Sequence, residues 1–284
     1  MVDRRTIIDP NKVDNNFFSN DSEESFYWAG FIAADGCVRI TNTKYSTIYS
    51  LEINLSSKDH QHLVKFRNDI KLKTDVRIRK TGKRITGEDL YISRLKLFSK
   101  KIINDLYSKF NIQSRKTHTL EFPNYLKNNK LIRHFMRGYF DGDGGFYLNK
   151  NKSPFQMSAR ICGTINFLTD FKSVLEENCG FISSSKPYMY NGQGALNYFG
   201  NGQLSKISNY LYNDSKIYLE RKFIQAKLSQ SIAVSRKTIT PDDIITTYRD
   251  LKSTYRVGNE LKVSQATIIN LIKKYNLHFL YEEK

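Results

Sequence analysis

Two short segments with the same pattern of small, apolar and acidic residues constrain this chain more than any other feature. The first covers residues 28–36 (WAGFIAADG) and the second covers residues 136–144 (MRGYFDGDG), 108 positions later. In each segment a glycine precedes further small residues by three or four positions, which places them on one face of a helix. Small residues on one face let two helix backbones approach closely, so we expect the two segments to be paired helices. Four small residues should form the contact: Gly30, Ala33, Gly138 and Gly142.

Each predicted helix ends at an aspartate followed by a glycine, Asp35-Gly36 and Asp143-Gly144. We expect each glycine to stop its helix because glycine tolerates the left-handed backbone conformation. A carboxylate at a helix C-terminus faces the negative end of the helix dipole, and two neighbouring carboxylates repel each other. A divalent cation relieves both conflicts, and Mg²⁺ commonly binds one or two carboxylates together with phosphate and water oxygens. The pattern therefore predicts a cation site between the two helix ends.

The chain is strongly basic, with 45 Lys and Arg against 28 Asp and Glu and a formal net charge of +17 over 284 residues. A basic protein of this size usually binds a polyanion, with nucleic acid ahead of an anionic membrane surface. No apolar run is long enough to cross a bilayer, and the first residues do not resemble a signal peptide. We expect an intracellular protein without a membrane partner, cytoplasmic in a bacterial or phage system, with an organelle as the alternative. His60 and His62 should be solvated rather than metal ligands.

The paired segments resemble the motifs of the LAGLIDADG homing endonucleases, in the single-chain form with two pseudo-symmetric halves. The match lies at the small, apolar, Asp and Gly positions; Ala33 replaces the commoner first acid, which Asp141 keeps. The resemblance implies an α+β fold in which two αββαββα halves carry antiparallel sheets that form a DNA-binding saddle. It also implies a monomer that cuts both strands of double-stranded DNA with two or more Mg²⁺ ions, for which Mn²⁺ would substitute. The metal ligands would be Asp35, Asp143, Gly36 and Gly144.

A basic pair follows the last predicted helix of each half, at residues 115–116 and 221–222. Lys116 lies 81 residues after Asp35, and Lys222 lies 79 residues after Asp143. Either pair alone would be an ordinary solvated surface pair. Their matched distances from the predicted metal ligands resemble the arrangement of the family's active-site lysines, so the predicted catalytic residues are Asp35, Asp143, Lys116 and Lys222.

The resemblance divides the chain into an N-terminal extension (1–24), a first half (25–125) and a second half (126–228). Strands with period-two alternation, such as residues 47–55, should bury one face and leave the other open. Polar side chains on the open faces are typical of any solvated sheet, and their assignment to the major groove rests on the resemblance. The predicted DNA contacts on the sheets are Arg39, Glu52, Asn54, Arg77, Arg79, Arg94, Asn149, Lys150, Gln156 and Arg160.

A linker is predicted over residues 229–240, followed by a small all-α module over residues 241–284. Pro and acidic residues after Thr240 mark a helix start, and Ser253 and Ser264 are suited to cap two more helices. The last two helices, joined by a short turn, are similar to a helix-turn-helix DNA-binding unit; the alternative is a three-helix bundle with another role. The third helix would present Gln265, Thr267 and Asn270 to DNA and lengthen the recognised site.

The sequence thus predicts a site-specific homing endonuclease that makes a metal-dependent double-strand break in a long target. A non-cleaving protein of the same fold is the alternative, either an intron RNA maturase or a DNA-binding regulator. Intron RNA is therefore a second candidate partner. Because such binders can lack one or both catalytic aspartates, the presence of Asp35 and Asp143 favours the enzyme.

Overall fold

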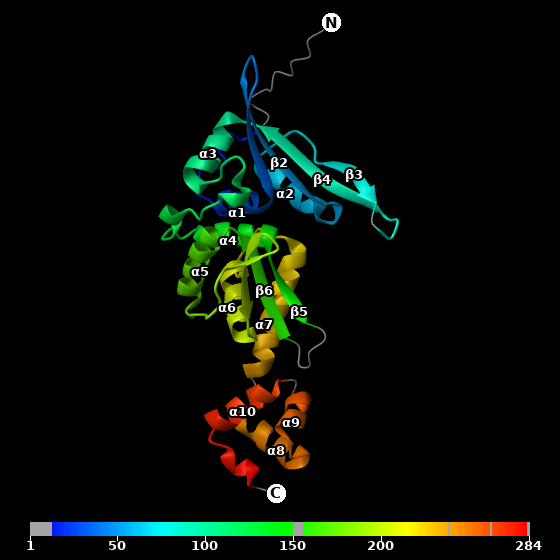
Figure 1. The fold of residues 1–284 in the computed structure, drawn as a ribbon, viewed down its shortest axis with the longest axis vertical. Coiled ribbons are helices and arrows are strands. Elements are labelled where there is room, and N and C mark those ends of the chain that lie inside the picture. Colours follow the sequence, from blue (N-terminus) through cyan, green and yellow to red (C-terminus); the bar gives the residue numbers. More distant parts are fainter. Residues whose placement is uncertain (1–12, 84, 150–155, 238, 262, 283–284) are drawn as a thin grey trace.

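Two similar halves follow one another along the chain, and a small helical module comes after them (Figure 1). The structure is a computed structural model that describes residues 13–83, 85–149, 156–237, 239–261 and 263–282, with residues 232–237 described by their backbone alone. Each half runs helix, two strands, helix, two strands, helix, which confirms the predicted α+β class. In the described part of the chain, no helix is both long enough and apolar enough to cross a membrane.

The first α-helix of the first half is α1, which is capped by Ser22 through a reciprocal pair of hydrogen bonds with Ser25. Its elements are α1 (Glu23–Asp35), β1 (Gly36–Asn42), β2 (Thr47–Ser56), η2 (Ser57–Asp59), α2 (His60–Asp69), β3 (Arg77–Lys83), β4 (Asp89–Phe98), α3 (Lys100–Phe110), η3 (Lys116–His118) and η4 (Asn124–Leu126).

The second half repeats this order. Its elements are α4 (Ile132–Asp143), β5 (Gly144–Asn149), β6 (Gln156–Gly163), α5 (Ile165–Cys179), β7 (Tyr188–Tyr190), β8 (Gln193–Phe199), α6 (Asn201–Tyr212) and α7 (Glu220–Lys237).

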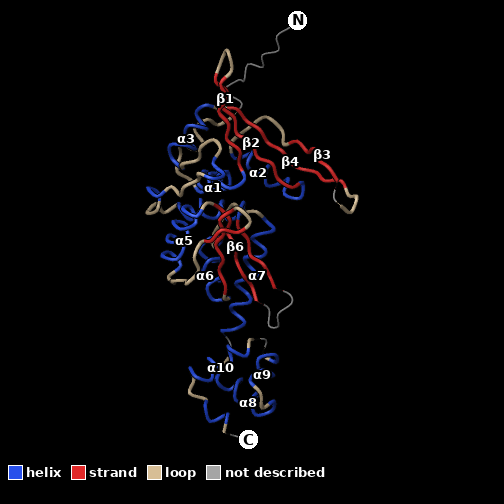
Figure 2. Tube along the Cα trace, in the orientation of Figure 1, coloured by secondary structure: helices blue, strands red, loops and turns tan. Residues whose placement is uncertain are grey.

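Each half holds one four-stranded antiparallel sheet, and Figure 2 shows the two sheets as separate sets of strands. The strand order is β1-β2-β4-β3 in the first sheet and β5-β6-β8-β7 in the second. Alternate residues of the central strands, such as Leu51, Ile53 and Leu95, are buried in the core against the helices. The residues between them, such as Glu52 and Asn54, lie on the opposite, open face.

The predicted N-terminal extension is part of the first half where the structure describes it. Phe18 is fully buried in the main core, and its ring lies edge-on to Phe110 of α3. The ammonium group of Lys109 donates to the carbonyl oxygens of Phe18 and Asn20, at 3.1 Å each. Residues 13–22 therefore cover the end of α3, and the boundary predicted at residue 24 does not separate them from the core.

The prediction of an irregular linker over residues 229–240 is wrong, because α7 continues as a helix to Lys237. Polar composition suggested a linker, but no Gly or Pro occurs between Glu220 and Pro241 to stop a helix. Between α7 and the module, the structure describes only Ile239 and Thr240, and Ile239 is buried among module residues.

The module consists of α8 (Pro241–Leu251), α9 (Thr254–Glu260), α10 (Gln265–Lys274) and the short helix η5 (His278–Tyr281). Thr240, Ser253 and Ser264 cap the three α-helices, as the sequence predicts. Its core, which includes Val257, Val263, Ile268 and Ile272, is a separate cluster from the core of the two halves. In Figure 1 the module lies beyond the C-terminal end of α7.

Candidate active site

Helices α1 and α4 pack against each other at a reciprocal pair of glycines. A methyl group on Gly30 would overlap the carbonyl oxygen of Phe135, and one on Gly138 would overlap the carbonyl oxygen of Tyr27. Gly30 thus lies against the backbone of α4 at Phe135, three residues before Gly138. Gly138 lies against the backbone of α1 at Tyr27, three residues before Gly30. Only a residue without a side chain fits at this separation, so the two backbones are in direct contact.

Nearer the helix ends, the contact is made by Ala34 rather than by the predicted Ala33. A methyl group on Gly142 would overlap the methyl group of Ala34, which marks the closest approach at this level. Ala33 is buried, and it occupies the position in α1 that Asp141 occupies in α4. The predicted spacing allowed either alanine, since both lie within one turn of Gly30.

Gly36 and Gly144 end the two helices for a different reason from the predicted one. Their backbones are extended rather than left-handed, with φ −79° and ψ 142° at Gly36 and φ −114° and ψ −178° at Gly144. A methyl group on Gly36 would lie 2.7 Å from the carbonyl oxygen of Ile32, and one on Gly144 would lie 2.6 Å from the ring of Phe140. Glycine is required here because the chain turns tightly against its own helix as it enters a strand.

Asp35 and Asp143 are brought together at the ends of this helix pair. Asp35 is exposed and Asp143 is half-buried, and neither carboxylate has a hydrogen bond or ion pair with another described residue. The carboxylate of Asp35 nevertheless lies against Gly142 of α4, and this partial loss of hydration raises its pKa, which the nearby Lys222 and Lys116 lower in part. Burial and the charge of Asp35 together raise the pKa of Asp143 to about 6. The two carboxylates are therefore close enough to repel each other.

Lys116 and Lys222 are both buried and reach the same helix ends from the two halves. Burial lowers the pKa of Lys116, and burial lowers the pKa of Lys222 to about 8, while nearby aspartates act in the opposite direction. Lys116 donates one hydrogen bond of 3.0 Å to the carbonyl oxygen of Ala34. Lys222 donates to three carbonyl oxygens, at 3.1 Å from Phe140, 2.9 Å from Gly142 and 2.6 Å from Gly144.

The donors around Asp35 and Asp143 suit a hard divalent cation. Two carboxylates with unused oxygens lie beside backbone carbonyl groups, and Mg²⁺ prefers oxygen ligands of this kind. Across the described segments, no group of three or more His, Cys, Asp or Glu side chains could hold a metal ion. The protein would thus supply part of the coordination shell, and phosphate and water oxygens would complete it.

No family model matches the sequence, and no curated protein matches it. In structure, the chain is similar to the homing endonuclease I-WcaI bound to its DNA recognition sequence. The TM-score is 0.52 and the identity 15%, over 73% of this chain and 90% of that chain. The chain has the LAGLIDADG homing endonuclease fold.

Two further solved structures resemble it less closely. The I-LtrWI LAGLIDADG homing endonuclease bound to target DNA has a TM-score of 0.48 and 13% identity, over 78% of this chain and 93% of that chain. The LAGLIDADG meganuclease I-AabMI bound to uncleaved DNA has a TM-score of 0.47 and 14% identity, over 79% of this chain and 96% of that chain.

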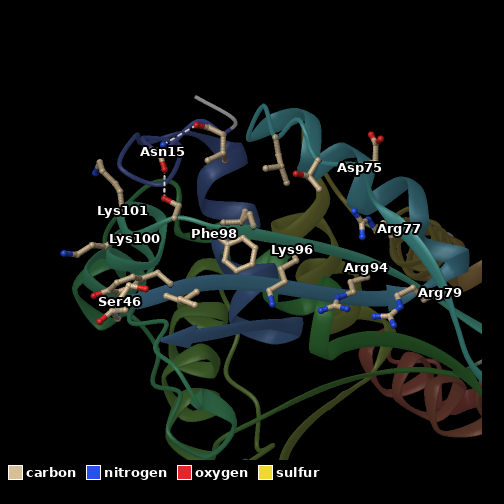
Figure 3. Close-up of a pocket in the computed structure, with 18 of the residues that line it drawn as sticks. Asn15, Ser46, Asp75, Arg77, Arg79, Arg94, Lys96, Phe98, Lys100 and Lys101 are labelled. Atoms are coloured by element: carbon tan, nitrogen blue, oxygen red, sulfur yellow. Dashed lines mark hydrogen bonds between the residues drawn. The ribbon is translucent and has the colours of Figure 1, made fainter. Parts of the chain in front are cut away.

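On the first sheet of this homing endonuclease fold, the predicted DNA-contacting side chains share the open face. Figure 3 shows Arg77, Arg79 and Arg94 near one another on this sheet, with Lys96 beside them. Some of these groups bind each other, because Glu52 accepts from Arg94 at 2.7 Å and from Asn54 at 3.0 Å. Arg39 lies on β1 and donates to the sulfur of Cys37 at 3.3 Å. Lys96 was not among the predicted DNA contacts, but it belongs to the same face because it is opposite Glu52.

On the second sheet, Arg160 and Gln156 lie on the open face of β6, and Asn149 is exposed on β5 opposite Gln156. Lys150, also predicted to contact DNA, lies outside the described residues. Arg160 donates to the side chain of Asn197 at 3.0 Å. Asn197 and the tyrosines of β7 were missed because the second strand pair of this half is short and rich in glycine and tyrosine.

The three residues of the module that were predicted to contact DNA differ in exposure and in hydrogen bonding. Gln265 is exposed but donates to the hydroxyl of Thr254 at 3.0 Å. The hydroxyl of Thr267 lies 2.7 Å from that of Ser264, within the cap of α10. Asn270 is exposed and has no hydrogen bond with another described residue. Of the three, Asn270 is therefore the residue best placed to bind a partner.

A buried polar network that the sequence did not predict lies beneath the ends of α1 and α4. The carboxylate of Asp141 is fully buried and accepts from the hydroxyls of Tyr27, at 2.7 Å, and Tyr212, at 2.6 Å. It also accepts from the backbone N–H of Leu219 at 2.7 Å, one residue before α7. Burial raises the pKa of Asp141 despite these three hydrogen bonds, which lower it. Asp141 therefore ties the segment that leads to Lys222 to both central helices.

His62 belongs to the same network, and the prediction that it is solvated is wrong. It is buried, its ring lies 4.7 Å from that of Trp28, and its Nε2 lies 2.9 Å from the hydroxyl of Tyr27. Since Tyr27 donates its single proton to Asp141, the Nε2–H of His62 donates to Tyr27. Burial lowers the pKa of His62 to about 3, which keeps the ring neutral.

Proposed function

We propose that this chain is a site-specific DNA endonuclease that depends on divalent metal ions and breaks both strands of a long target. The single observation that carries the proposal is the placement of two carboxylates with raised pKa values, Asp35 and Asp143, at the ends of two closely packed helices. Such a pair is unfavourable unless a cation or proton binds there. The DNA-bound state of I-WcaI, with which the chain shares its fold, supports DNA as the substrate.

The protein side chains would bind the metal ions and place positive charge near the scissile phosphate. Asp35 and Asp143 would hold Mg²⁺ or Mn²⁺, with the Gly36 carbonyl oxygen as a further ligand. The Gly144 carbonyl oxygen, which already accepts from Lys222, would serve through its second lone pair. Bound divalent cations supply Lewis-acid activation of the scissile phosphate and of the attacking water. Lys116 and Lys222 place positive charge at the same helix ends, where it offsets the negative charge that develops on the phosphate.

Selection of cleavable duplexes from a random DNA library in Mg²⁺ tests this function. The expected result is enrichment of one long, largely asymmetric site that is cut in both strands. Omission of the metal and the double variant with Asp35→Asn and Asp143→Asn serve as controls, and both should give no cut product. Tight, specific binding without cleavage in Mg²⁺ or Mn²⁺ would contradict the enzyme and favour the non-cleaving binder, with intron RNA then tested as its partner.

A further inference from the structure

The open faces of the two sheets differ sharply in chemistry. The first carries a cluster of cations beside the exposed Ile48 and Phe98, and the second carries mostly aromatic and amide side chains. The basic face of the first sheet is formed by Arg39, Arg77, Arg79, Arg94 and Lys96, with Glu52 as its acid. In the four described strands of the second sheet, Arg160 is the sole Lys or Arg.

The basic face contains two arginines opposite each other, of which only one has an acidic partner in the isolated protein. Arg77 on β3 and Arg94 on β4 are directly opposite each other, so their side chains share one face at close range. Arg94 is paired with Glu52 at 2.7 Å. Arg77 and its neighbour Arg79 are exposed and have no ion pair or hydrogen bond with any described residue. Like charges opposite each other destabilise a sheet, and a bound polyanion relieves the repulsion.

On the open face of the second sheet, which we call the aromatic face, Arg160 and Asn197 are satisfied within the protein. Arg160 lies 5.0 Å from the ring centre of Tyr190 and donates to Asn197. Asn197 in turn donates to the hydroxyl of Tyr188 at 2.7 Å. Tyr147, Tyr188, Tyr190 and Phe199 remain exposed by 38–62%, although aromatic rings of this size are usually buried. An exposed group of rings on a binding face indicates a partner with apolar surface.

We infer that the two halves read DNA of different base composition: a G·C-rich half-site at the basic face and an A·T-rich half-site at the aromatic face. This inference rests on the proposed DNA target. Arginine and lysine are donors only, and in the major groove guanine presents two acceptors, O6 and N7. Aromatic and other apolar groups contact the methyl group of thymine, while asparagine and glutamine pair with adenine. Gln156, exposed on β6, supplies such an amide beside the aromatic face.

The rival interpretation is that the arginines bind only phosphate groups, which would raise affinity without any base preference. Geometry favours base contact for Arg77 and Arg94, because they lie on β3 and β4 within the sheet, at its open face, rather than in a surrounding loop. A two-stranded ribbon of this kind fits the major groove of B-DNA. Selection experiments separate the two interpretations.

The test is binding selection of a random duplex library by the full chain in Ca²⁺, followed by sequencing. The expected target has one half enriched in G·C and the other in A·T. Two variants assign the halves. The double variant with Arg77→Gln and Arg79→Gln should lower discrimination for guanine by roughly tenfold or more, at positions in one half only. Tyr147→Ala should weaken the preference for thymine in the other half only.

Lys130→Gln is the matched control, since it removes one exposed charge from the loop before α4. It should lower affinity slightly without changing base preference. Two results would overturn the inference: half-sites of equal base composition, or an Arg77/Arg79 variant whose affinity falls by the same factor for every DNA sequence. Because selection uses binding in Ca²⁺, a protein that selects these half-sites but never cuts them would leave the inference standing and contradict the proposed nuclease.

Discussion

The ammonium group of Lys222 donates a hydrogen bond of 2.6 Å to the carbonyl oxygen of Gly144, the residue that follows the proposed metal ligand Asp143. Its other two hydrogen bonds go to carbonyl oxygens at the end of α4, so all three of its donors are used. Lys116, its counterpart, has one described acceptor, Ala34. The two lysines occupy matched positions but differ in how firmly they are fixed.

We expect Lys222→Met to destabilise the protein and Lys116→Met to do so much less. Removal of Lys222 takes the ammonium donor from the carbonyl oxygens of Gly142 and Gly144, while Phe140 keeps the N–H of Gly144, and this should lower the free energy of unfolding by about 1–3 kcal/mol. Both variants should slow cleavage by about 10²-fold, the usual scale for loss of one positioned electrostatic group. Thermal unfolding and single-turnover rates measure the two effects. Equal melting temperatures for the two variants would show that the extra hydrogen bonds of Lys222 contribute nothing.

Asp35→Asn and Asp143→Asn should each abolish double-strand cleavage while DNA binding in Ca²⁺ changes only modestly. Amide groups keep the shape of the helix ends but are poor ligands for Mg²⁺. Asp214→Asn, an exposed aspartate of the second half, is the matched control and should cut normally. Normal cleavage by both helix-end variants would show that Asp35 and Asp143 do not take part in the cleavage reaction.

Substitution at the helix contact should be costly even for a single methyl group. Gly30→Ala and Gly138→Ala place a methyl group on a backbone carbonyl of the facing helix, which cannot move as a side chain can. We expect a loss of about 1–3 kcal/mol or more in the free energy of unfolding, together with reduced cleavage. Gly202→Ala is the matched control, because Gly202 is also helical and no atom lies within 4 Å of the added methyl group.

That control should stabilise the protein by about 0.5–1 kcal/mol, since alanine is a better helix former than glycine. Denaturant unfolding of the three variants compares the effects directly. If Gly30→Ala and Gly202→Ala shift the midpoint in the same direction, the helices do not meet as the structure shows.

The stability of the core should fall as the pH drops below about 6.5, because His62 is held neutral. Its folded-state pKa of about 3 lies below the ordinary value of 6.5, so the unfolded chain binds the proton more readily. This contribution to stability is complete above pH 6.5 and declines by roughly 1.4 kcal/mol per pH unit below it.

His62→Gln keeps a donor for Tyr27 but does not titrate, so its unfolding free energy should depend less steeply on pH between 6.5 and 4. Exposed His278 offers the matched control, and His278→Gln should leave the pH profile of the wild type unchanged. Parallel profiles for wild type and His62→Gln would contradict a neutral, buried histidine.

The sequence predicted the parts of the fold that depend on local pattern and on repetition. The repeated Asp-Gly segments predicted the helix pair, and capping residues such as Ser253 and Ser264 predicted helix starts, because these signals involve residues close together in the chain. The polar composition of residues 229–240 predicted a linker, whereas the lack of any Gly or Pro there lets α7 continue to Lys237. Asp141 was recognised as an acid of the motif, but its burial depends on Tyr27 and Tyr212, which are distant in sequence.

The last prediction concerns the C-terminal module, which we propose extends the DNA site without taking part in the chemistry. It has its own core and contains none of the proposed catalytic residues. Residues 241–284 hold seven basic and six acidic side chains, so the module adds little to the overall attraction for DNA. Any gain in affinity would come from specific contacts made by a tethered second site.

Deletion of residues 239–284 tests the module as a unit, because Ile239 already belongs to its core and α7 ends at Lys237. The truncated protein should still cut at high concentration, with lower affinity and a footprint shortened at one end. The dependence of affinity on salt should change little, since few phosphate-binding charges are lost. In the full chain, Asn270→Ala should relax base preference at that end by about 1–3 kcal/mol. Thr267→Ala, which instead removes a hydroxyl from the cap of α10, should mainly lower the stability of the module. An unchanged footprint and affinity after truncation would assign the module to a role other than DNA binding.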